Sequence, residues 1–584
     1  MNLKRDDTSV ITPLVALYGE TEGYRTFAQL RAGRERLRLP KHKSGGPLTQ
    51  RDSILITYAD QVQQPEISPL RTLADFCTRY LSDMISGIHL LPFYPYSSDD
   101  GFSVIDYRAV GEGLGDWGDV SHLGQDFRLM FDAVINHVSV QSTWFKRFLQ
   151  DDPRFRDYFF VVDGDPDLSQ VVRPRALPLL TPFKTSTGMK QIWTTFSSDQ
   201  VDLNYHKPEV LLEVINTLLF YASQGAELIR LDAIAYLWKE IGTPCIHLPQ
   251  THLIIQIMRA VLDQVAPYVM LVTETNVPHE ENISYFGSGY NEAQLVYNFA
   301  LPPLVLYTIQ TGDVRILSHW ARGLSLPSKR VTFFNFLASH DGIGINPVRG
   351  VIPEGGVEML IQKTLEHRGF IAYKHNVDGS KSPYELNINY FDALCNPGEE
   401  APLEEQIGRF MAAQAIMLIL VGVPGIYFHS LFGSRGWPEG VQLTGRERTI
   451  NRQKLIVEDL ERELSDPASR RSRVYEKFRR LLKARAGCPA FHPFGDQRVI
   501  ECGESIFALV RYSPDHDKSV LCLQNVSSQP RLATINHREF PGERTGRWRF
   551  RDLIHERPYV INRQDSIILE PYQTLWLELS NYLG

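Results

Sequence analysis

The apolar positions of this chain gather into short runs that alternate with longer amphipathic stretches. Runs of this length between polar residues predict buried strands, and the stretches between them are long enough for helices. The eight runs are residues 54–58, 87–91, 129–135, 227–231, 269–273, 295–299, 331–337 and 425–428. Strands that alternate with helices form parallel sheets, so eight of them predict an α/β fold closed into a (β/α)8 TIM barrel.

Two connections between these runs are too long to be ordinary loops. One follows the third predicted strand and the other follows Asp341, so both should lean over the carboxyl ends of the strands. From about residue 491 the pattern changes to short strands typical of an antiparallel β domain. The predicted parts are an N-terminal helical extension (1–50), the barrel (51–138, 207–342 and 403–490), an inserted B domain (139–206), an inserted B′ domain (343–402) and a C-terminal β domain (491–584).

Acidic side chains follow three of the predicted strands, namely Asp232, Glu274 and Asp341. The carboxyl ends of barrel strands share one face, so these side chains should meet there. A retaining glycosidase needs two carboxyl groups about 5–5.5 Å apart, one ionised to attack and one protonated to donate. Arg230 precedes Asp232 by two residues on the same strand face and should keep it ionised, whereas apolar surroundings should raise the pKa of Glu274. The alternative is that each is an ordinary loop acid.

Composition excludes several other classes of protein. The 584 residues are 43% apolar and 22% charged, and the formal charge of −7 offers no basic surface for nucleic acid or an anionic membrane. Six scattered cysteines without a CxxC pair, and a charged N-terminus without an apolar core, predict a reduced, cytoplasmic protein. The longest apolar run, 411–428, contains Pro424 and Gly425, which favours a buried helix and strand over a membrane span.

Histidines beside the acids raise the alternative of a metal site. His137 and His340 lie next to polar motif residues, but the chain has no HExxH or paired-histidine spacing. We therefore predict no metal and no other cofactor. The expected partners are small-molecule substrates, and the expected state is a monomer or a homodimer.

Four segments resemble glycoside hydrolase family 13, the α-amylase family: DAVINH (132–137), RLD (230–232), TE (273–274) and SHD (339–341). Four more resemble its subfamily 18, the sucrose phosphorylase group: LITYAD (55–60), SDDGF (98–102), GTPCIH (242–247) and HDGIG (340–344). The resemblance covers nearly the whole chain. It implies a (β/α)8-barrel enzyme that reversibly transfers a glucosyl unit to inorganic phosphate.

The resemblance also implies roles for single residues. Asp232 would be the nucleophile, Glu274 the acid/base and Asp341 the stabiliser of the transition state. The other expected contacts of the glucosyl unit and the phosphate are Asp99, Phe102, His137, Arg175, Gln200, Arg230, His340 and Arg452.

Three of these contacts have specific expected functions. Asp99 would bind the far hydroxyl together with an arginine of the segment RTINR (448–452), with Arg452 preferred over Arg448, and so close the pocket behind one glucose. Phe102 would be a platform for the ring. Arg175 would bind phosphate through two parallel hydrogen bonds, which a water molecule cannot exploit; a surface ion pair is the alternative.

The segment 381–387 departs from the sucrose phosphorylases, and Lys381, Tyr384 and Glu385 are our candidate contacts for the aglycone. Ser382 and Glu385 stand where those enzymes carry an aspartate and a glutamine, which disfavours sucrose. Basic residues suggest an anionic acceptor: Arg349, Lys374, His375 and Lys381. The pattern most resembles members that act on 2-O-α-glucosylglycerate. Sucrose 6′-phosphate is the next candidate, then glucosylglycerol or sucrose, and a plain α-glucosidase is disfavoured.

Overall fold

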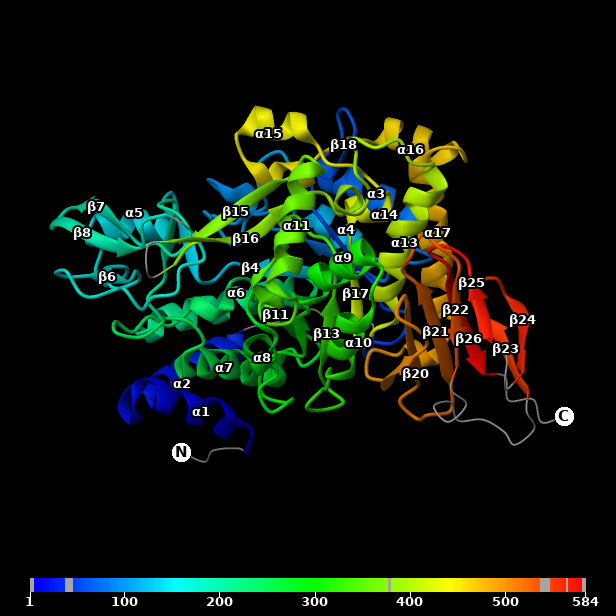
Figure 1. Cartoon of the computed structure of the whole chain (residues 1–584). Helices are drawn as coiled ribbons and strands as arrows, with labels where there is room; N and C mark the ends of the chain where they lie inside the picture. Colours follow the sequence, from blue (N-terminus) through cyan, green and yellow to red (C-terminus); the bar gives the residue numbers. More distant parts are fainter. Residues whose placement is uncertain are drawn as a thin grey trace.

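A closed barrel of eight parallel strands lies at the centre of the computed structural model, which describes residues 5–36, 46–175, 177–376, 380–535, 547–562 and 566–579 (Figure 1). Around the barrel the order is β1 (Ile54–Thr57), β17 (Val423–Tyr427), β13 (Thr332–Asn335), β12 (Leu295–Tyr297), β11 (Met270–Thr273), β10 (Ala226–Leu231), β4 (Arg128–Ala133) and β3 (Gly87–Leu90). These are the eight predicted strands, each within two residues at either end, so the predicted barrel is confirmed. Their side chains are almost all buried, which is why the strands are mostly apolar runs in the sequence.

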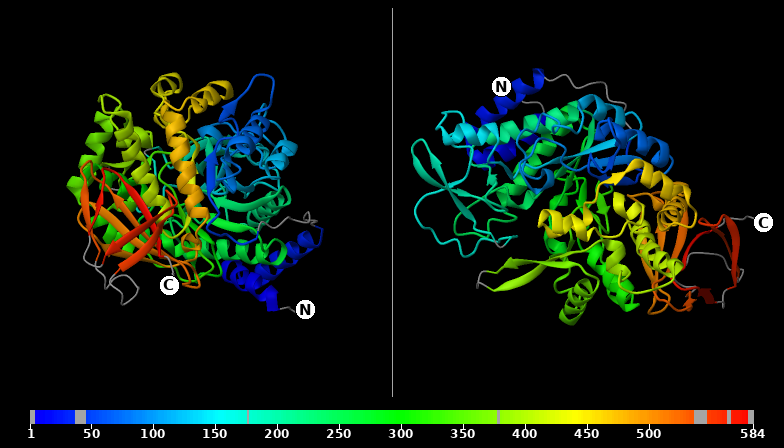
Figure 2. Two further views of the ribbon diagram at one scale, coloured as in Figure 1. Left: turned by 90° about the vertical axis from the view of Figure 1, so that its right-hand side faces the viewer. Right: turned by 90° about the horizontal axis from the view of Figure 1, so that it is seen from above.

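Helices cover the outside of the barrel between successive strands (Figure 2). They are α3 (Pro69–Leu81), α4 (Trp117–Leu123), α6 (Pro208–Ser223), α7 (Pro249–Val265), α8 (His279–Ile283), α9 (Leu301–Thr311), α10 (Arg315–Arg322), α13 (Leu403–Ile419) and α17 (Arg470–Ala486). The long apolar run is the buried helix α13 followed by β17, as predicted. Within the described ranges, no helix has the length and apolar character that crossing a bilayer requires.

Two insertions interrupt the barrel at the carboxyl ends of β4 and β13. The B insertion holds β5 (His137–Ser139), α5 (Thr143–Leu149), β6 (Val161–Val162), β7 (Leu180–Thr185), β8 (Gly188–Trp193) and β9 (Gln200–Asp202). The B′ insertion holds β14 (Ile343–Gly344), α11 (Glu354–Glu366), β15 (Phe370–His375), β16 (Lys381–Asn387) and α12 (Tyr390–Leu394). The B′ strands form one antiparallel sheet in the order β14, β16, β15, which stands over the barrel mouth (Figure 1).

The segment between β17 and α17 also lies at this end of the barrel. It holds α14 (Phe428–Leu431), α15 (Pro438–Thr444), β18 (Leu455–Ile456), which pairs with β2 (Val62–Gln63), and α16 (Val457–Ser465). A short 3-10 turn, Glu447–Asn451, follows α15. This turn brings Arg448 and the adjacent Arg452 to the barrel mouth, where both line a cavity.

Helices α1 (Arg5–Tyr18) and α2 (Glu20–Arg36) form a hairpin that packs on the outside of α7 and α6. Val10, Leu14 and Phe27 are fully buried. The hairpin lies far from the C-terminal strands (Figure 1).

The C-terminal part is a β domain at the far end of the molecule from the B insertion (Figures 1 and 2). Its strands are β19 (Gln497–Glu501), β20 (Ile506–Tyr512), β21 (Ser519–Asn525), β22 (Arg531–Thr534), β23 (Arg547–Asp552), β24 (Arg557–Asn562), β25 (Ser566–Leu569) and β26 (Thr574–Leu579). Six of them form one antiparallel sheet, and β22 pairs with β25.

One buried arginine joins this domain to the floor of the barrel, and a second connects parts of that floor. Arg511 of β20 donates to the carbonyls of Ile419 and His492, both at 2.8 Å. Arg485 of α17 donates to the carbonyls of Gln50 and Gly422 at 2.6 and 3.1 Å. Both guanidinium groups thus bridge backbone from distant parts of the chain.

Candidate active site

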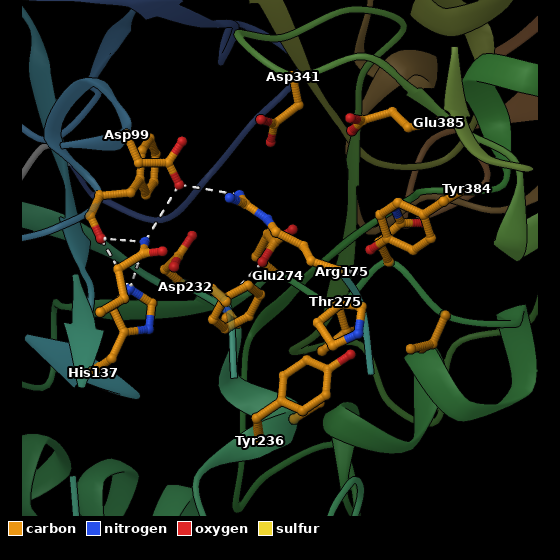
Figure 3. Close-up of a pocket in the computed structure, with 18 of the residues that line it drawn as sticks. Asp99, His137, Arg175, Asp232, Tyr236, Glu274, Thr275, Asp341, Tyr384 and Glu385 are labelled. Atoms are coloured by element: carbon orange, nitrogen blue, oxygen red, sulfur yellow. Dashed lines mark hydrogen bonds and ion pairs between the residues drawn. The ribbon is translucent and has the colours of Figure 1, made fainter. Parts of the chain in front are cut away.

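A pocket opens at the carboxyl ends of the barrel strands and is lined by residues from the barrel and both insertions (Figure 3). Asp232 and Glu274 follow β10 and β11, and Asp341 follows β13. All three line this one pocket, so the predicted convergence of the strand-end acids is seen in the fold. The other lining residues that the sequence predicted are Asp99, Phe102, His137, Arg175, Gln200, His340, Tyr384 and Glu385.

Arg230 holds the two principal acids together. Its Nη1 lies 2.9 Å from Asp232 Oδ1, and its Nη2 lies 3.8 Å from Glu274 Oε1. The backbone N–H of Ala233, a residue in the left-handed conformation with φ of 49°, donates to Glu274 Oε2 at 2.9 Å. One guanidinium therefore contacts both carboxyl groups, and the turn after β10 fixes the second of them.

The pKa values of these two acids are set by burial and by Arg230. Burial raises the pKa of Asp232 and the carboxyl of Glu274 raises it further, while Arg230 opposes both effects. Burial also raises the pKa of Glu274, against Arg230 and the N–H of Ala233. Arg230 thus makes the contact expected from the sequence, but burial outweighs it and the pKa of Asp232 is not lowered. Because Arg230 is closer to Asp232 than to Glu274, it favours the ionised form of Asp232 more strongly than that of Glu274.

Behind Arg230 lies a buried pair that the sequence interpretation missed. Asp132 of β4 forms an ion pair with Arg230, and its other oxygen lies 2.8 Å from His89 Nε2. His89 and Asp132 are fully buried in the barrel. The pair could have been found from the sequence, because a histidine and an aspartate stand inside two mostly apolar strands and buried polar groups require partners. The pair fixes the position of Arg230.

One wall of the pocket is built around Asp99. Its carboxylate lies 3.1 Å from Arg175 Nη2 and accepts from Gln200 Nε2 at 3.3 Å. Gln200 also donates to the carbonyl of Phe102 at 3.0 Å, and His137 Nε2 lies 2.9 Å from the same carbonyl. Burial opposes ionisation of Asp99, but Arg175 and two further arginines nearby hold its pKa well below the usual value. Asp99 is therefore an ionised acceptor.

The backbone around Asp99 is unusual. Asp99, Asp100 and Gly101 all have positive φ, of 54°, 49° and 112°. A Cβ on Gly101 would lie 2.5 Å from the carbonyl oxygen of Pro92, so only glycine fits there. Such strain commonly accompanies functional sites, and here it turns Asp99 toward the pocket.

Arg452, expected to bind the far hydroxyl together with Asp99, forms its ion pair with the neighbouring Asp100, and its contact with the sugar stays a prediction. Its Nη1 forms an ion pair with Asp100, and its Nε donates to the carbonyl of His340 at 2.9 Å. The two adjacent aspartates thus pair with different arginines. Asp99 pairs with Arg175 of the B insertion, and Asp100 pairs with Arg452, which follows the turn after α15. Sequence spacing could not distinguish them, because both arginines come from distant segments.

Asp341 lies between arginines on the opposite wall. Arg448 Nη1 is 2.7 Å from its carboxylate and Arg452 Nη2 is 3.6 Å from it. Burial alone would raise the pKa of Asp341, but Arg448 and its other charged neighbours hold it below the usual value. Arg448 also contacts both oxygens of Glu385, at 3.0 and 3.1 Å. In the sequence interpretation, Arg448 was the alternative to Arg452 as the partner of Asp99.

Phe102 and His340 stack face to face, with ring centroids 4.7 Å apart and an angle of 4° between the planes. The ring of Phe102 also faces the guanidinium of Arg230 at 5.7 Å. Burial lowers the pKa of His340 to about 3, so the imidazole is neutral. Whether Phe102 supports a sugar ring stays a prediction.

Lys381 is not brought to the pocket. Its side chain is exposed at the start of β16 and lines none of the cavities around the active site. Tyr384 and Glu385, on the same strand, do line the pocket. The register of the hairpin explains the difference, because the strand enters the protein only beyond its first residues.

An ammonium group occupies the junction between barrel and B insertion. Lys239 Nζ lies 2.7 Å from Asp202 Oδ2 and donates to Asn136 Oδ1 at 2.8 Å. All three side chains are buried. The lysine supplies the positive charge at a place where oxygen ligands could otherwise hold a cation. Among the described residues, no group of three or more histidine, cysteine or acidic side chains is arranged to hold a metal ion.

The barrel with its pocket of facing carboxyl groups defines a class of enzymes that act on glycosidic bonds. The alpha amylase catalytic domain family matches residues 78–341. Over 572 residues the chain is 50% identical to the glucosylglycerate phosphorylase of Spirochaeta thermophila, covering 96% of this chain and 97% of that protein. It is 46% identical over 528 residues to the glucosylglycerate phosphorylase of Escherichia coli, covering 90% and 92%. The chain belongs to the alpha-amylase family and, within it, to the group that these phosphorylases form.

A solved structure shows the same fold. The crystal structure of sucrose 6F-phosphate phosphorylase from Thermoanaerobacter thermosaccharolyticum superposes with a TM-score of 0.71 at 24% identity, covering 83% of this chain and 95% of that one. This likeness shows the shared fold, and the relatives in sequence confirm the resemblance to the sucrose phosphorylase group.

Proposed function

We propose that the protein is a retaining glucoside phosphorylase that transfers a glucosyl unit from 2-O-α-glucosylglycerate to inorganic phosphate. The observation that carries the mechanism is the contact of Arg230 with both Asp232 and Glu274 in one pocket. Because the two carboxyl groups lie at different distances from one cation, they can differ in protonation. A double displacement needs one ionised and one protonated carboxyl group.

In the first step Asp232 attacks the anomeric carbon of the bound glucosyl unit. Glu274 gives its proton to the leaving oxygen of glycerate, and a β-glucosyl ester of Asp232 forms. Arg230, at 2.9 Å, stabilises the carboxylate that attacks. Asp341, kept ionised by Arg448, faces the positive charge that develops on the ring.

We propose that the wall around Asp99 limits the donor to one glucose. Asp99, His137 and Gln200 form a connected hydrogen-bonded wall there, and sugar hydroxyls can donate to the ionised Asp99. A second sugar unit beyond this wall would displace buried, paired polar groups. An exo-acting enzyme follows from this geometry.

In the second step phosphate attacks the ester from the side that glycerate left. Glu274, now ionised, takes a proton from the incoming phosphate, and the product is α-glucose 1-phosphate. Arg175 supports the choice of phosphate over water, because its guanidinium can bind two oxygens of one dianion. Its side chain projects over the pocket beside Asp99 (Figure 3).

Glycerate as the aglycone is supported by the relatives of this chain. Proteins 50%, 49% and 46% identical to it are named glucosylglycerate phosphorylases. The sucrose 6(F)-phosphate phosphorylase of Thermoanaerobacterium thermosaccharolyticum is 29% identical, so sucrose 6′-phosphate is the second candidate. Glu385, expected near the aglycone, is bound on both oxygens by Arg448 and is therefore proposed as a support for that arginine.

Product analysis tests this proposal. Incubation with glucosylglycerate and phosphate should release glucose 1-phosphate and glycerate in equal amounts, and omission of phosphate should slow turnover strongly. Asp232→Asn should lower the rate by about 10⁴-fold or more with an unchanged circular dichroism spectrum, since the covalent route is lost. Free glucose formed equally fast with and without phosphate would contradict the assignment.

We also propose that the enzyme acts in the cytoplasm as a monomer or a homodimer. All six cysteines are buried, and none of them forms a disulfide bond in the described part of the chain, which suits a reducing compartment. Size-exclusion chromatography with light scattering measures the assembly, and fractionation of cells measures the location.

A further inference from the structure

A side chamber adjoins the aglycone end of the active-site pocket. It has a volume of about 450 Å³ and shares Tyr236, Asn276 and Tyr384 with that pocket. Figure 3 shows Tyr236 and Tyr384 on the side away from Asp99 and His137. A leaving group displaced from the glucosyl unit therefore lies toward this chamber.

Lys374 is the lysine of the B′ insertion that reaches this chamber. It projects from β15, is half-buried, and its Nζ lies 3.5 Å from Asn346 Oδ1. This is a long contact to a neutral amide, so the ammonium retains donor capacity for a ligand. Lys381, on the paired strand of the same hairpin, is exposed. The hairpin thus directs one of its two sequence-predicted lysines inward.

A second polar group in the chamber has a side-chain oxygen without a hydrogen-bond donor. Asn276 Oδ1 is buried and accepts no hydrogen bond from the described residues. The asparagine side chain packs against Gly344, where an added Cβ would lie 2.6 Å from it, and its backbone carbonyl accepts from Asn346 Nδ2 at 3.4 Å. A buried carbonyl oxygen without a donor favours a ligand that brings one, such as a hydroxyl.

Three other charged groups face Lys374 and set the charge of the site. Glu281 lines the chamber, but its carboxylate lies 3.3 Å from His247 Nε2 on the far wall. Arg349 lies close enough to repel Lys374, and its Nη2 is engaged with the carbonyl of Pro383 at 3.0 Å. Arg173 also lines the chamber, donating to the carbonyl of Leu177. The basic side chains Lys374, Arg349 and Arg173 outnumber the one acid, Glu281. The net positive charge suits a small anion.

We propose that this chamber binds the aglycone, with Lys374 pairing its carboxylate and Asn276 accepting a hydrogen bond from its free hydroxyl. The inference rests on the proposed function and names the residues that distinguish glycerate from neutral acceptors. A small hydroxy acid has one anionic group and a neighbouring hydroxyl donor, which matches one ammonium and one unpartnered carbonyl oxygen. The preference for glycerate then arises largely from the ammonium of Lys374, because a neutral acceptor leaves this charge unpaired.

The test compares acceptors in the reverse direction, with glucose 1-phosphate as donor and glycerate or glycerol as acceptor. Lys374→Met should lower the ratio of kcat/KM for glycerate to that for glycerol by about tenfold to hundredfold, mainly through KM for glycerate. Lys374→Arg, which keeps the charge, should retain most of the preference. Lys363→Met, a lysine of α11 in the same insertion that lines none of the described cavities, is the matched control.

The outcomes separate this inference from the proposed function. A wild-type enzyme that does not prefer glycerate over glycerol would overturn both. A wild-type preference that Lys374→Met leaves intact would overturn the chamber alone. A rise in KM for phosphate with an unchanged glycerate preference would likewise overturn it, because the ammonium would then serve phosphate.

Discussion

Arg175 and Asp99 form an ion pair of 3.1 Å across the active-site pocket. The pair joins the B insertion to the strained turn after β3. It holds the guanidinium over the pocket before any phosphate arrives, so less side-chain freedom is lost when phosphate binds.

Arg175→Gln should therefore shift the second step from phosphate toward water. We expect the ratio of glucose 1-phosphate to free glucose, measured at fixed phosphate, to fall about tenfold or more, since a charged hydrogen-bonding group is lost. Arg156→Gln, on an exposed arginine of the same insertion, is the control. An unchanged product ratio in Arg175→Gln would show that another group selects phosphate.

Glu274→Gln should separate proton donation from nucleophilic attack. We expect glucosylglycerate phosphorolysis to slow by about 10²–10⁴-fold, because the leaving oxygen receives no proton. α-Glucosyl fluoride, whose leaving group needs little protonation, should lose much less in the first step. The burst of fluoride release measures this. Equal losses on both substrates would argue against an acid role.

Lys239→Met should destabilise the junction between barrel and B insertion. The ammonium is buried against Asp202 at 2.7 Å, so its removal leaves a buried carboxylate without its cation. We expect the free energy of unfolding to fall by about 3–5 kcal/mol. The double variant Lys239→Met/Asp202→Asn should recover part of this loss in the same denaturant titration. Additive losses would contradict the pairing.

Stability should fall on acidification because several histidines are buried in the neutral form. Burial lowers the pKa of His340 and of His429 to about 3 and that of His247 to about 4. The unfolded chain, with histidine pKa values near 6.5, binds more protons between about pH 4 and 6.5. The free energy of unfolding therefore decreases as the pH falls through this window.

A single histidine can be isolated by difference. His429→Gln should reduce the pH dependence of the unfolding free energy by up to about 1.4 kcal/mol per pH unit below pH 6 relative to wild type. His319→Gln, at an exposed histidine, should leave that dependence unchanged. Denaturant titrations at pH 5, 6 and 7 measure the slopes, and parallel slopes for His429→Gln and wild type would refute the account.

The barrel and its acids could be predicted because both follow from local patterns. Each strand is almost wholly buried and therefore mostly apolar. Asp232 and Glu274 stand directly after such strands, and Asp341 lies in the segment that follows a third. Backbone topology alone then brings these acids to one face.

The arginines could not be paired from the sequence. Arg452 contacts Asp100 across 352 positions of chain, and the choice between Asp99 and Asp100 depends on a turn with two consecutive left-handed aspartates. The inward direction of Lys374 rather than Lys381 likewise depends on the register of the β15–β16 hairpin. Local patterns carry no information on such long-range geometry.

The arginines beneath the barrel have a consequence for engineering the chain. Arg511 anchors the last domain to the end of α13, and Arg485 ties the final barrel helix to the segment that leads into the first strand. A shortened chain ending near residue 490 would keep every pocket residue, yet it would uncover the underside of the barrel and leave the carbonyl of Ile419 without its donor. Such a fragment should aggregate rather than serve as a minimal catalyst.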